Sequence, residues 1–404
     1  MRLMISFAAL FLSISLLQLS SGAIGPLDAL SGLQSGFTTA QIGLLGSAHF
    51  LGFLVGCWWS PRLMGTVGHA RTFAIFASFG AIGALAHPML ISPLSWALLR
   101  ILTGLCVAGC YTVIEAWLQA KLTNENRGRV MGGYRVVDIT ASALAQMMIG
   151  FLEPAAYLSY NLLAILCCAC LLPLAMTKAV QPHVPKALSL QPRKSWHTSP
   201  LGVAGVLVAG VTAAAFRMVG PLYGVEVGLT SAQVGYFMAL VLVGGALAQY
   251  PIGWFADKYD RRWVLIWLSA ASILACLAMA AVSDGSARSI LATATVFGFA
   301  TYPIFSVSIA HANDFCTPED RVSLNASLFL FYAIGAIFSP IITSYLIQIF
   351  GPFALFAFVS IAHASLLVFG LSRSRVRATK KTKTRYKYVP RTSFIINRLL
   401  RRKK

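Results

Sequence analysis

Five ionisable side chains lie inside long apolar runs of this sequence, where a charge is costly. They are Arg100, Glu115, Arg135, Asp138 and Arg217. A charged side chain at the centre of a membrane helix costs about 2.5–3.5 kcal/mol on insertion scales, so such a residue is a functional candidate. Carboxylates can bind and release protons, and arginines can bind anions. The sequence therefore predicts a pathway for protons or for a charged solute along these residues.

Three of the five charges are expected at one depth. The loop between the two runs that carry them is centred near residue 125, and reflecting Glu115 across this point gives a position near 136. At a rise of 1.5 Å per residue, Glu115, Arg135 and Asp138 then lie roughly 10 Å in from the loop. Arg135 and Asp138 also share a helix face, since they are spaced i, i+3. We expect a cluster of two acids and one base.

This cluster has two interpretations. It is either a static clip that neutralises charge between two helices, or a part of a cavity that binds protons or solute. Arginine is always charged, so two acids and one base leave one negative charge in excess. The second half of the chain has Ile309, Phe329 and Tyr332 at the corresponding places. The static clip is the preferred interpretation, but a purely architectural requirement should recur in both halves, so this asymmetry adds some weight to the functional interpretation.

The elements that position these charges are predicted to be membrane helices. The chain is 57% hydrophobic and 11% charged, about half the charged fraction of a soluble protein. A helix needs about 20 apolar residues to cross a bilayer, and these runs are too long for barrel strands. Twelve runs qualify, and they are 4–27, 41–61, 71–92, 95–118, 131–151, 156–177, 200–223, 232–254, 263–283, 289–311, 323–348 and 352–371.

Basic residues collect on one side of the predicted membrane. If the N-terminus is cytoplasmic, the cytoplasmic loops hold nearly all of the loop Lys and Arg residues, and the opposite loops hold Arg288. This positive-inside pattern predicts that both termini are cytoplasmic.

The tail, 372–404, carries 14 of the 32 basic residues and no acid. We expect it to be disordered, and it either adheres to anionic lipid or only fixes topology and solvation. Nucleic acid is not an expected partner.

The sequence repeats itself after about half its length. GFTTAQIG at 36–43 returns as GLTSAQVG at 228–235, at an offset of 192 residues. TNENR at 123–127 returns as TPEDR at 317–321, at an offset of 194 residues. The shared order and membrane side indicate two parallel copies of six helices. The predicted parts are a first bundle at 1–177, a basic linker at 178–199, a second bundle at 200–371 and the tail.

A further phrase carries a family resemblance. GWFADKYDRR, residues 253–262, resembles the loop Gly-x-x-x-Asp-(Lys/Arg)-x-Gly-(Arg/Lys)-(Arg/Lys) of the major facilitator superfamily. EAWLQ followed by NRGR, QYPIGWFADK and TYPIFSVSIAH resemble the YcaD-like group of bacterial inner-membrane permeases within that superfamily. The resemblance implies a multi-pass protein of the inner membrane, with two six-helix bundles that give alternating access to a central site.

The resemblance also implies that this loop latches one conformation of the protein. The candidate latch consists of Gly253, Asp257, Lys258, Arg261 and Arg262. A glycine lets its helix approach a neighbour closely, and an acid at a helix end can meet a base or the positive end of another helix. Alternatively, these charges only mark topology. Asp260 departs from the family glycine, and Gly65 replaces the acid in the first half, which weakens the expectation of a second latch there.

Arg100 and Arg217 are candidates for a solute or proton pathway. Arg100 begins RILTGLCVAG, which resembles a family motif whose buried arginine is linked to proton coupling. Alternatively, its side chain extends outward to the membrane surface. In this family the first, fourth, seventh and tenth helices line the cavity, which implies that Arg100 and Arg217 belong to opposite halves of it. Two such arginines would suit an anionic solute such as a carboxylate.

We therefore interpret the chain as a secondary active transporter of a small solute, with protons as the expected coupling ion. The alternative is a receptor or sensor on a transporter fold that signals through its basic tail. The sequence has no nucleotide-binding motif, no Cys/His spacing for a metal and no convergent catalytic groups, so no cofactor and no enzymatic activity are expected. The antiporter signature of the superfamily is absent from the fifth run, which weakens proton antiport. We expect a monomer.

Overall fold

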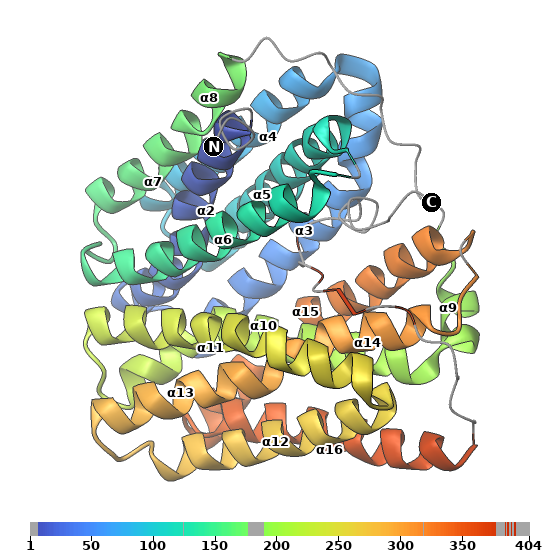
Figure 1. Ribbon diagram of the computed structural model, residues 1–404. Coiled ribbons are helices and arrows are strands. Elements are labelled where there is room, and N and C mark those ends of the chain that lie inside the picture. The colour runs from blue at the N-terminus through green and yellow to red at the C-terminus, as the bar shows by residue number, and fades with distance from the viewer. Residues whose placement is uncertain are drawn as a thin grey trace. The chain divides into compact units, whose positions relative to one another are not determined.

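The computed structural model describes residues 7–123, 125–176, 190–317 and 319–376, and in the tail Thr384, Tyr386, Lys387, Val389 and Thr392. All of the regular structure in these residues is helical, as predicted. The described residues up to 176, with Thr392, belong to one compact unit, and those from 190 to 389 belong to a second. Figure 1 shows the helices of each unit packed side by side.

The first unit contains six long helices. They are α2 (Ala8–Gln34), α3 (Thr39–Val67), α4 (His69–Ala86, continued by the 3₁₀ turn η1, His87–Met89), α5 (Pro93–Lys121), α6 (Arg127–Met147, continued by η2, Met148–Gly150) and α7 (Tyr157–Ala169, continued by α8, Leu171–Ala175). In this unit α3 packs along α5, and α2 packs along α6 and α7.

The second unit repeats this plan. Its helices are α9 (Pro192–Thr198), α10 (Pro200–Glu226), α11 (Ser231–Lys258), α12 (Arg261–Ala281), α13 (Ala287–Thr301) with α14 (Pro303–Asn313), α15 (Arg321–Phe350) and α16 (Ala354–Val376). Here α11 packs along α13, and α10 packs along α15. The predicted tenth span is thus two helical segments, which divide at Tyr302 and Pro303.

Eleven spans in the described part of the chain are long and apolar enough to cross a membrane. The remaining predicted span corresponds to α6, whose charged residues include Arg127, Arg129, Arg135 and Asp138. On α12, Trp267, Leu274 and Leu277 are 58–70% exposed and share one helix face. A stripe of large exposed apolar side chains is expected where lipid, and not water, covers a helix.

The repeated phrase GFTTAQIG/GLTSAQVG forms the same turn and helix start in both units. Gly36 and Gly228 have φ angles of 80° and 82°, in the left-handed region that glycine adopts without a steric penalty. Thr38 and Gln41 then form a capping box at the start of α3, and Thr230 and Gln233 form one at the start of α11. The repeat therefore preserves the backbone signals that end one span and begin the next.

Glycines also allow equivalent helix pairs to approach closely in both units. A Cβ atom on Gly104 of α5 would overlap the carbonyl oxygen of His49 on α3. A Cβ atom on Gly298 of α13 would overlap the carbonyl oxygen of Val241 on α11 in the same way. Small residues at such crossings let the two backbones pack directly against each other. The α3–α5 and α11–α13 contacts are therefore close helix crossings that the duplication preserved.

Several boundaries differ from those expected from hydropathy. The first helix continues seven residues beyond the predicted end at Leu27, to Gln34, because Asp28 lowers the hydropathy but lies buried within the unit. The second part of the predicted linker forms α9, which packs against α15, and the part up to residue 189 lies outside the described residues. Helix α16 extends to Val376, five residues past the predicted end of the second bundle at Leu371.

Replacing Gly298 with alanine should destabilise the second unit. The added methyl group would force α11 and α13 apart, and overpacking of this kind costs about 1–3 kcal/mol. Gly132→Ala on α6 is the matched control, because a Cβ atom there meets nothing within 4 Å. The apparent melting temperature of each purified variant in one detergent measures the effect. An unchanged melting temperature for Gly298→Ala would contradict the close packing.

Candidate functional site

Two acids of the first unit are bound reciprocally between α5 and α6. The hydroxyl of Tyr111 on α5 donates a hydrogen bond to Asp138 Oδ1 on α6, at 2.6 Å. The hydroxyl of Tyr134 on α6 donates one to Glu115 Oε1 on α5, at 3.2 Å. Each tyrosine precedes the acid of its own helix by one turn, so the two helices exchange equivalent contacts. The two acids therefore lie at neighbouring levels, and Arg135 follows Tyr134 directly on α6.

The surroundings of the two acids differ. Glu115 is fully buried, and the hydroxyl of Thr392 in the tail also donates a hydrogen bond to its Oε1 atom. Asp138 is half-buried, and Gln18 of α2 donates a second hydrogen bond to its Oδ1 atom, at 3.1 Å. Asp138 on α6 therefore contacts two further helices, α5 and α2, and is partly accessible, whereas Glu115 is enclosed.

The second unit fills the equivalent place with aromatic rings. Phe305 and Tyr332 stand 194 residues after Tyr111 and Asp138. Their ring centroids lie 5.1 Å apart in an edge-to-face arrangement, which is a favourable packing of two aromatic side chains. Packing of the helices at this place therefore does not require a carboxylate, and in the second unit it is achieved without one.

A second polar cluster of the first unit surrounds Asp28. Arg100 Nη1 lies 3.5 Å from Asp28 Oδ2, and His87 Nε2 lies 3.3 Å from the same oxygen. The hydroxyl of Tyr160 donates a hydrogen bond to Asp28 Oδ1 at 2.9 Å, and its ring stacks on the imidazole of His87. All four side chains are at most 1% exposed. Arg100 is thus neutralised within its own unit by a buried carboxylate.

Arg217 lies in the second half of α10 and is half-buried. Within the part of the chain that the structure describes, its guanidinium forms no ion pair or hydrogen bond. On the same helix, Thr212 contacts His363 of α16, with 3.0 Å between Oγ1 and Nε2. Arg217 differs in this respect from Arg100, which is paired with Asp28 in the first unit.

Arg261 is the centre of the candidate latch. Its guanidinium is 1% exposed and forms ion pairs with Asp314 at 2.7 Å and with Asp257 at 2.9 Å. It also donates hydrogen bonds to the carbonyl oxygens of Ala256 and Ala310, at 3.2 and 3.0 Å. A buried guanidinium between two carboxylates joins the end of α11, the start of α12 and the segment that follows α14.

The other latch residues have local roles. Asp260 caps the N-terminus of α12, accepting a hydrogen bond from the Arg262 amide at 3.0 Å, and forms an ion pair with the Arg262 side chain at 2.7 Å. This explains an acid where the family resemblance implies glycine. The ammonium group of Lys258 lies over the ring of Trp254, 4.7 Å from its centroid. Gly253 lies against the ring of Tyr386 in the tail.

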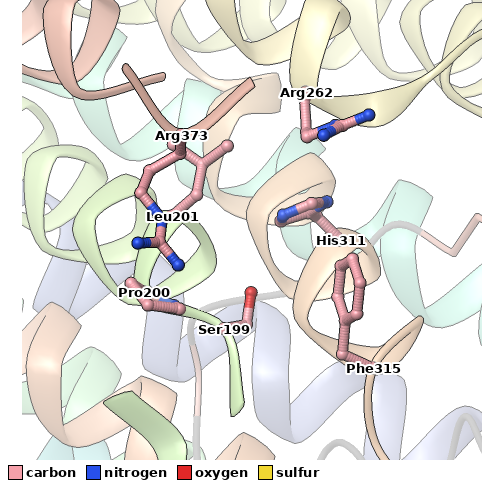
Figure 2. Close-up of a pocket in the computed structure, with 7 residues that line it drawn as sticks. All are labelled: Ser199, Pro200, Leu201, Arg262, His311, Phe315 and Arg373. Atoms are coloured by element: carbon pink, nitrogen blue, oxygen red, sulfur yellow. The ribbon is translucent and has the colours of Figure 1, made fainter. Parts of the chain in front are cut away.

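A small recess with a cavity volume of about 20 Å³ lies beside the candidate latch in the second unit. Its lining residues are Ser199, Pro200, Leu201, Arg262, His311, Phe315 and Arg373. Figure 2 shows His311 and Phe315 on one side of the recess and Pro200 and Leu201 on the other. Solute pockets are usually about 300–1,000 Å³, and Arg262 is already paired with Asp260. The recess is therefore a weaker candidate for a solute site than the surroundings of Asp138.

Comparison with known families identifies the fold that holds these clusters. A family model described as the Major Facilitator Superfamily matches residues 201–404. The chain belongs to the major facilitator superfamily (MFS). It is 29% identical over 335 residues to an uncharacterized MFS-type transporter of Enterobacter sp. (strain 638), covering 82% of this chain and 86% of the relative. It is 28% identical over 347 residues to the uncharacterized MFS-type transporter YcaD of Escherichia coli O7:K1, covering 85% and 90%.

Solved MFS structures share this fold. A point mutant of the nucleoside transporter NupG aligns with a TM-score of 0.74 at 14% identity, over 90% of this chain and 98% of that one. A bacterial homologue of the human lysosomal transporter Spinster, inward-facing and unoccupied, aligns with a TM-score of 0.69 at 13% identity, over 98% and 96%. The chain is therefore a multi-pass membrane protein of the MFS type.

The sequence alone did not predict most of the residues that form hydrogen bonds or ion pairs with the candidate site residues. The missed residues are Gln18, His87, Tyr111, Tyr134, Tyr160, Asp314, Thr384 and Tyr386. A local signal existed for two of them, because Tyr111 and Tyr134 each stand one helical turn before an acid. Asp314 lies just beyond a helix end, where an acid was not counted as buried.

Replacing Asp28 with asparagine should destabilise the first unit, because Arg100 would lose its anionic partner while it remains buried. Removing one member of a buried ion pair costs about 3–5 kcal/mol. The double variant Asp28→Asn with Arg100→Leu should recover much of this loss. Melting temperatures of both single variants and the double variant form the test. A double variant no more stable than Asp28→Asn would argue against the pairing.

Replacing Asp314 with asparagine should destabilise the second unit by about 3 kcal/mol, since Arg261 would keep one carboxylate where it now has two. Asp284→Asn is the matched control, because Asp284 is exposed in a loop. Thermal unfolding in detergent measures both variants. Equal melting temperatures of the two variants would show that the Arg261–Asp314 contact does not contribute to the stability of the second unit.

Proposed function

We propose that this chain is a secondary active transporter that couples movement of a small solute to protons, with Asp138 as the proton-binding group. The observation that carries the proposal is the difference between the units at one helix contact. The first unit has a half-buried, hydrogen-bonded Asp138, where the second unit packs Phe305 against Tyr332. A carboxylate at membrane depth that packing does not require is best explained by function.

The partners of Asp138 support a proton site. Tyr111 and Gln18 both donate to its Oδ1 atom, and an ionised carboxylate accepts hydrogen bonds whereas a protonated one also carries a donor. A proton that binds to Asp138 would weaken these two contacts and would change how α2, α5 and α6 hold together. Proton binding would thus bias the conformation of the first bundle, which is the link that coupling requires.

Arg217 supports an anionic solute. Its half-buried guanidinium forms no ion pair or hydrogen bond in the described residues, and arginine binds carboxylates in a planar two-point geometry. Arg100 supports this less well than expected, because Asp28 neutralises it. The proposed solute is therefore a small anion that contacts Arg217 from the side of the second bundle.

The membrane orientation is part of the same proposal. The distribution of Lys and Arg supports insertion in a bacterial inner membrane with both termini in the cytoplasm. In this orientation the latch and the tail lie on the cytoplasmic side. A monomer is sufficient for alternating access, because one chain contains both bundles.

Replacing Asp138 with asparagine should abolish solute-dependent proton movement and leave solute exchange intact. A thermal-shift screen of the purified protein against small anions first identifies a ligand that stabilises the fold. Proteoliposomes with a trapped pH-sensitive dye then report proton flux when that ligand is added, and counterflow of the labelled ligand reports exchange.

Glu153→Gln is the matched control for this experiment, because Glu153 is an exposed acid in a loop. It should keep both proton flux and counterflow at the level of the unchanged protein. Proton flux of normal size in the Asp138→Asn variant would contradict the role of Asp138. Loss of flux and counterflow together would indicate a structural role for this residue.

A further inference from the structure

The tail returns to the second unit at the two acids of the latch. The backbone N–H of Thr384 donates a hydrogen bond to Asp314 Oδ1 at 2.7 Å, and its hydroxyl donates to the same oxygen at 2.8 Å. Arg261 donates to the Thr384 hydroxyl at 3.0 Å and also to the Thr384 carbonyl oxygen. Thr384 thus forms hydrogen bonds with both members of the buried Arg261–Asp314 ion pair.

Tyr386 engages the other acid of the latch. Its backbone N–H donates a hydrogen bond to Asp257 Oδ1 at 2.6 Å, and its hydroxyl donates to Gln249 Oε1 at 2.8 Å. The ring lies over Gly253, where a Cβ atom would come within 2.6 Å of two ring carbons. The latch glycine therefore makes room for a tail side chain.

The contacts extend to Val389. This residue is 4% exposed, and its backbone N–H donates a hydrogen bond to Ser306 Oγ on α14 at 3.3 Å. Thr384 and Tyr386 are two residues apart, and residues at this spacing face the same side of an extended chain. An extended peptide can therefore present both backbone N–H groups to the two latch carboxylates.

The contacts given above for Thr384, Tyr386 and Val389 come from uncharged groups. The described hydrogen bonds come from backbone N–H groups, a threonine hydroxyl and a tyrosine hydroxyl. Lys387, within the same segment, is exposed. A surface that binds backbone N–H groups and an aromatic ring is selective for a particular peptide. An anionic lipid surface would instead bind the tail through its net charge.

We propose that the latch is a peptide-binding site and that Thr384, Tyr386 and Val389 of this chain's own tail occupy it. The bound segment holds Arg261 between Asp257 and Asp314, and it bridges the end of α11 to α14. Any movement that separates these two acids must first release the tail. The tail is therefore a brake on the latch, and this role is independent of proton coupling at Asp138.

Hydrogen exchange on the full-length protein tests the docking directly. In a neutral detergent without anionic lipid, the amides of Thr384 and Tyr386 should exchange at least about tenfold more slowly than in a free peptide of residues 380–391, because both donate to carboxylates. Tyr386→Ala should remove the protection at both positions, and Asp284→Asn, in an exposed loop away from these contacts, should retain it. Exchange at the free-peptide rate in the unchanged protein would overturn the proposal.

A peptide added in trans separates specific docking from charge attraction. The full-length Tyr386→Ala variant, whose own tail has lost its ring contact, is mixed with a fluorescent peptide of residues 380–391, and binding is followed by fluorescence anisotropy. The native peptide should bind saturably and about tenfold more tightly than both a scrambled peptide of equal charge and a Tyr386→Ala peptide. Equal binding of native and scrambled peptides would overturn the proposal, and vesicles with anionic lipid should leave the difference between them unchanged.

Discussion

An ion inside an apolar helix bundle has to be neutralised by its neighbours, because an uncompensated buried charge costs several kcal/mol. This constraint fixes how the helix ends of each unit meet. In the first unit, Asp28 gathers Arg100, His87 and Tyr160 around one carboxylate, so that α2, α5 and α7 converge with the turn after α4. In the second unit, Arg261 plays the corresponding part with Asp257 and Asp314.

Duplication preserved the backbone of the two units and left their polar groups free to diverge. The capped turns after Gly36 and Gly228 match, and so do the close helix crossings at Gly104 and Gly298. These features depend on backbone geometry, which every copy of the bundle needs. The ionisable clusters differ between the units: Asp138 accepts hydrogen bonds from Tyr111 and Gln18 in one, and Arg261 lies between Asp257 and Asp314 in the other. An MFS protein needs asymmetry of this kind if only one half is to sense protons.

Hydropathy and the repeat were sufficient to predict the helices and the duplication, because both depend on local sequence. The reflection of Glu115 across its loop also predicted that it lies level with the region of Arg135 and Asp138, since an antiparallel hairpin fixes depth. The partner of Arg100 could not be predicted, because depth along a helix does not reveal which neighbour faces it. The contacts of the tail with the second unit could not be predicted from the sequence either. They use backbone N–H groups, which are the same in every sequence, and the composition of the tail suggested only charge.

The proline at the start of α14 has a mechanical consequence. Pro303 has no N–H to donate, so the tenth span loses hydrogen-bond continuity at this point and can bend there. On one side, α13 is clamped to α11 through Gly298. On the other side, α14 is a rod of 11 residues that leads to Asp314. A bend at this point would move α14 and Asp314 relative to α13, and the part of the span before Pro303 would keep its packing against α11.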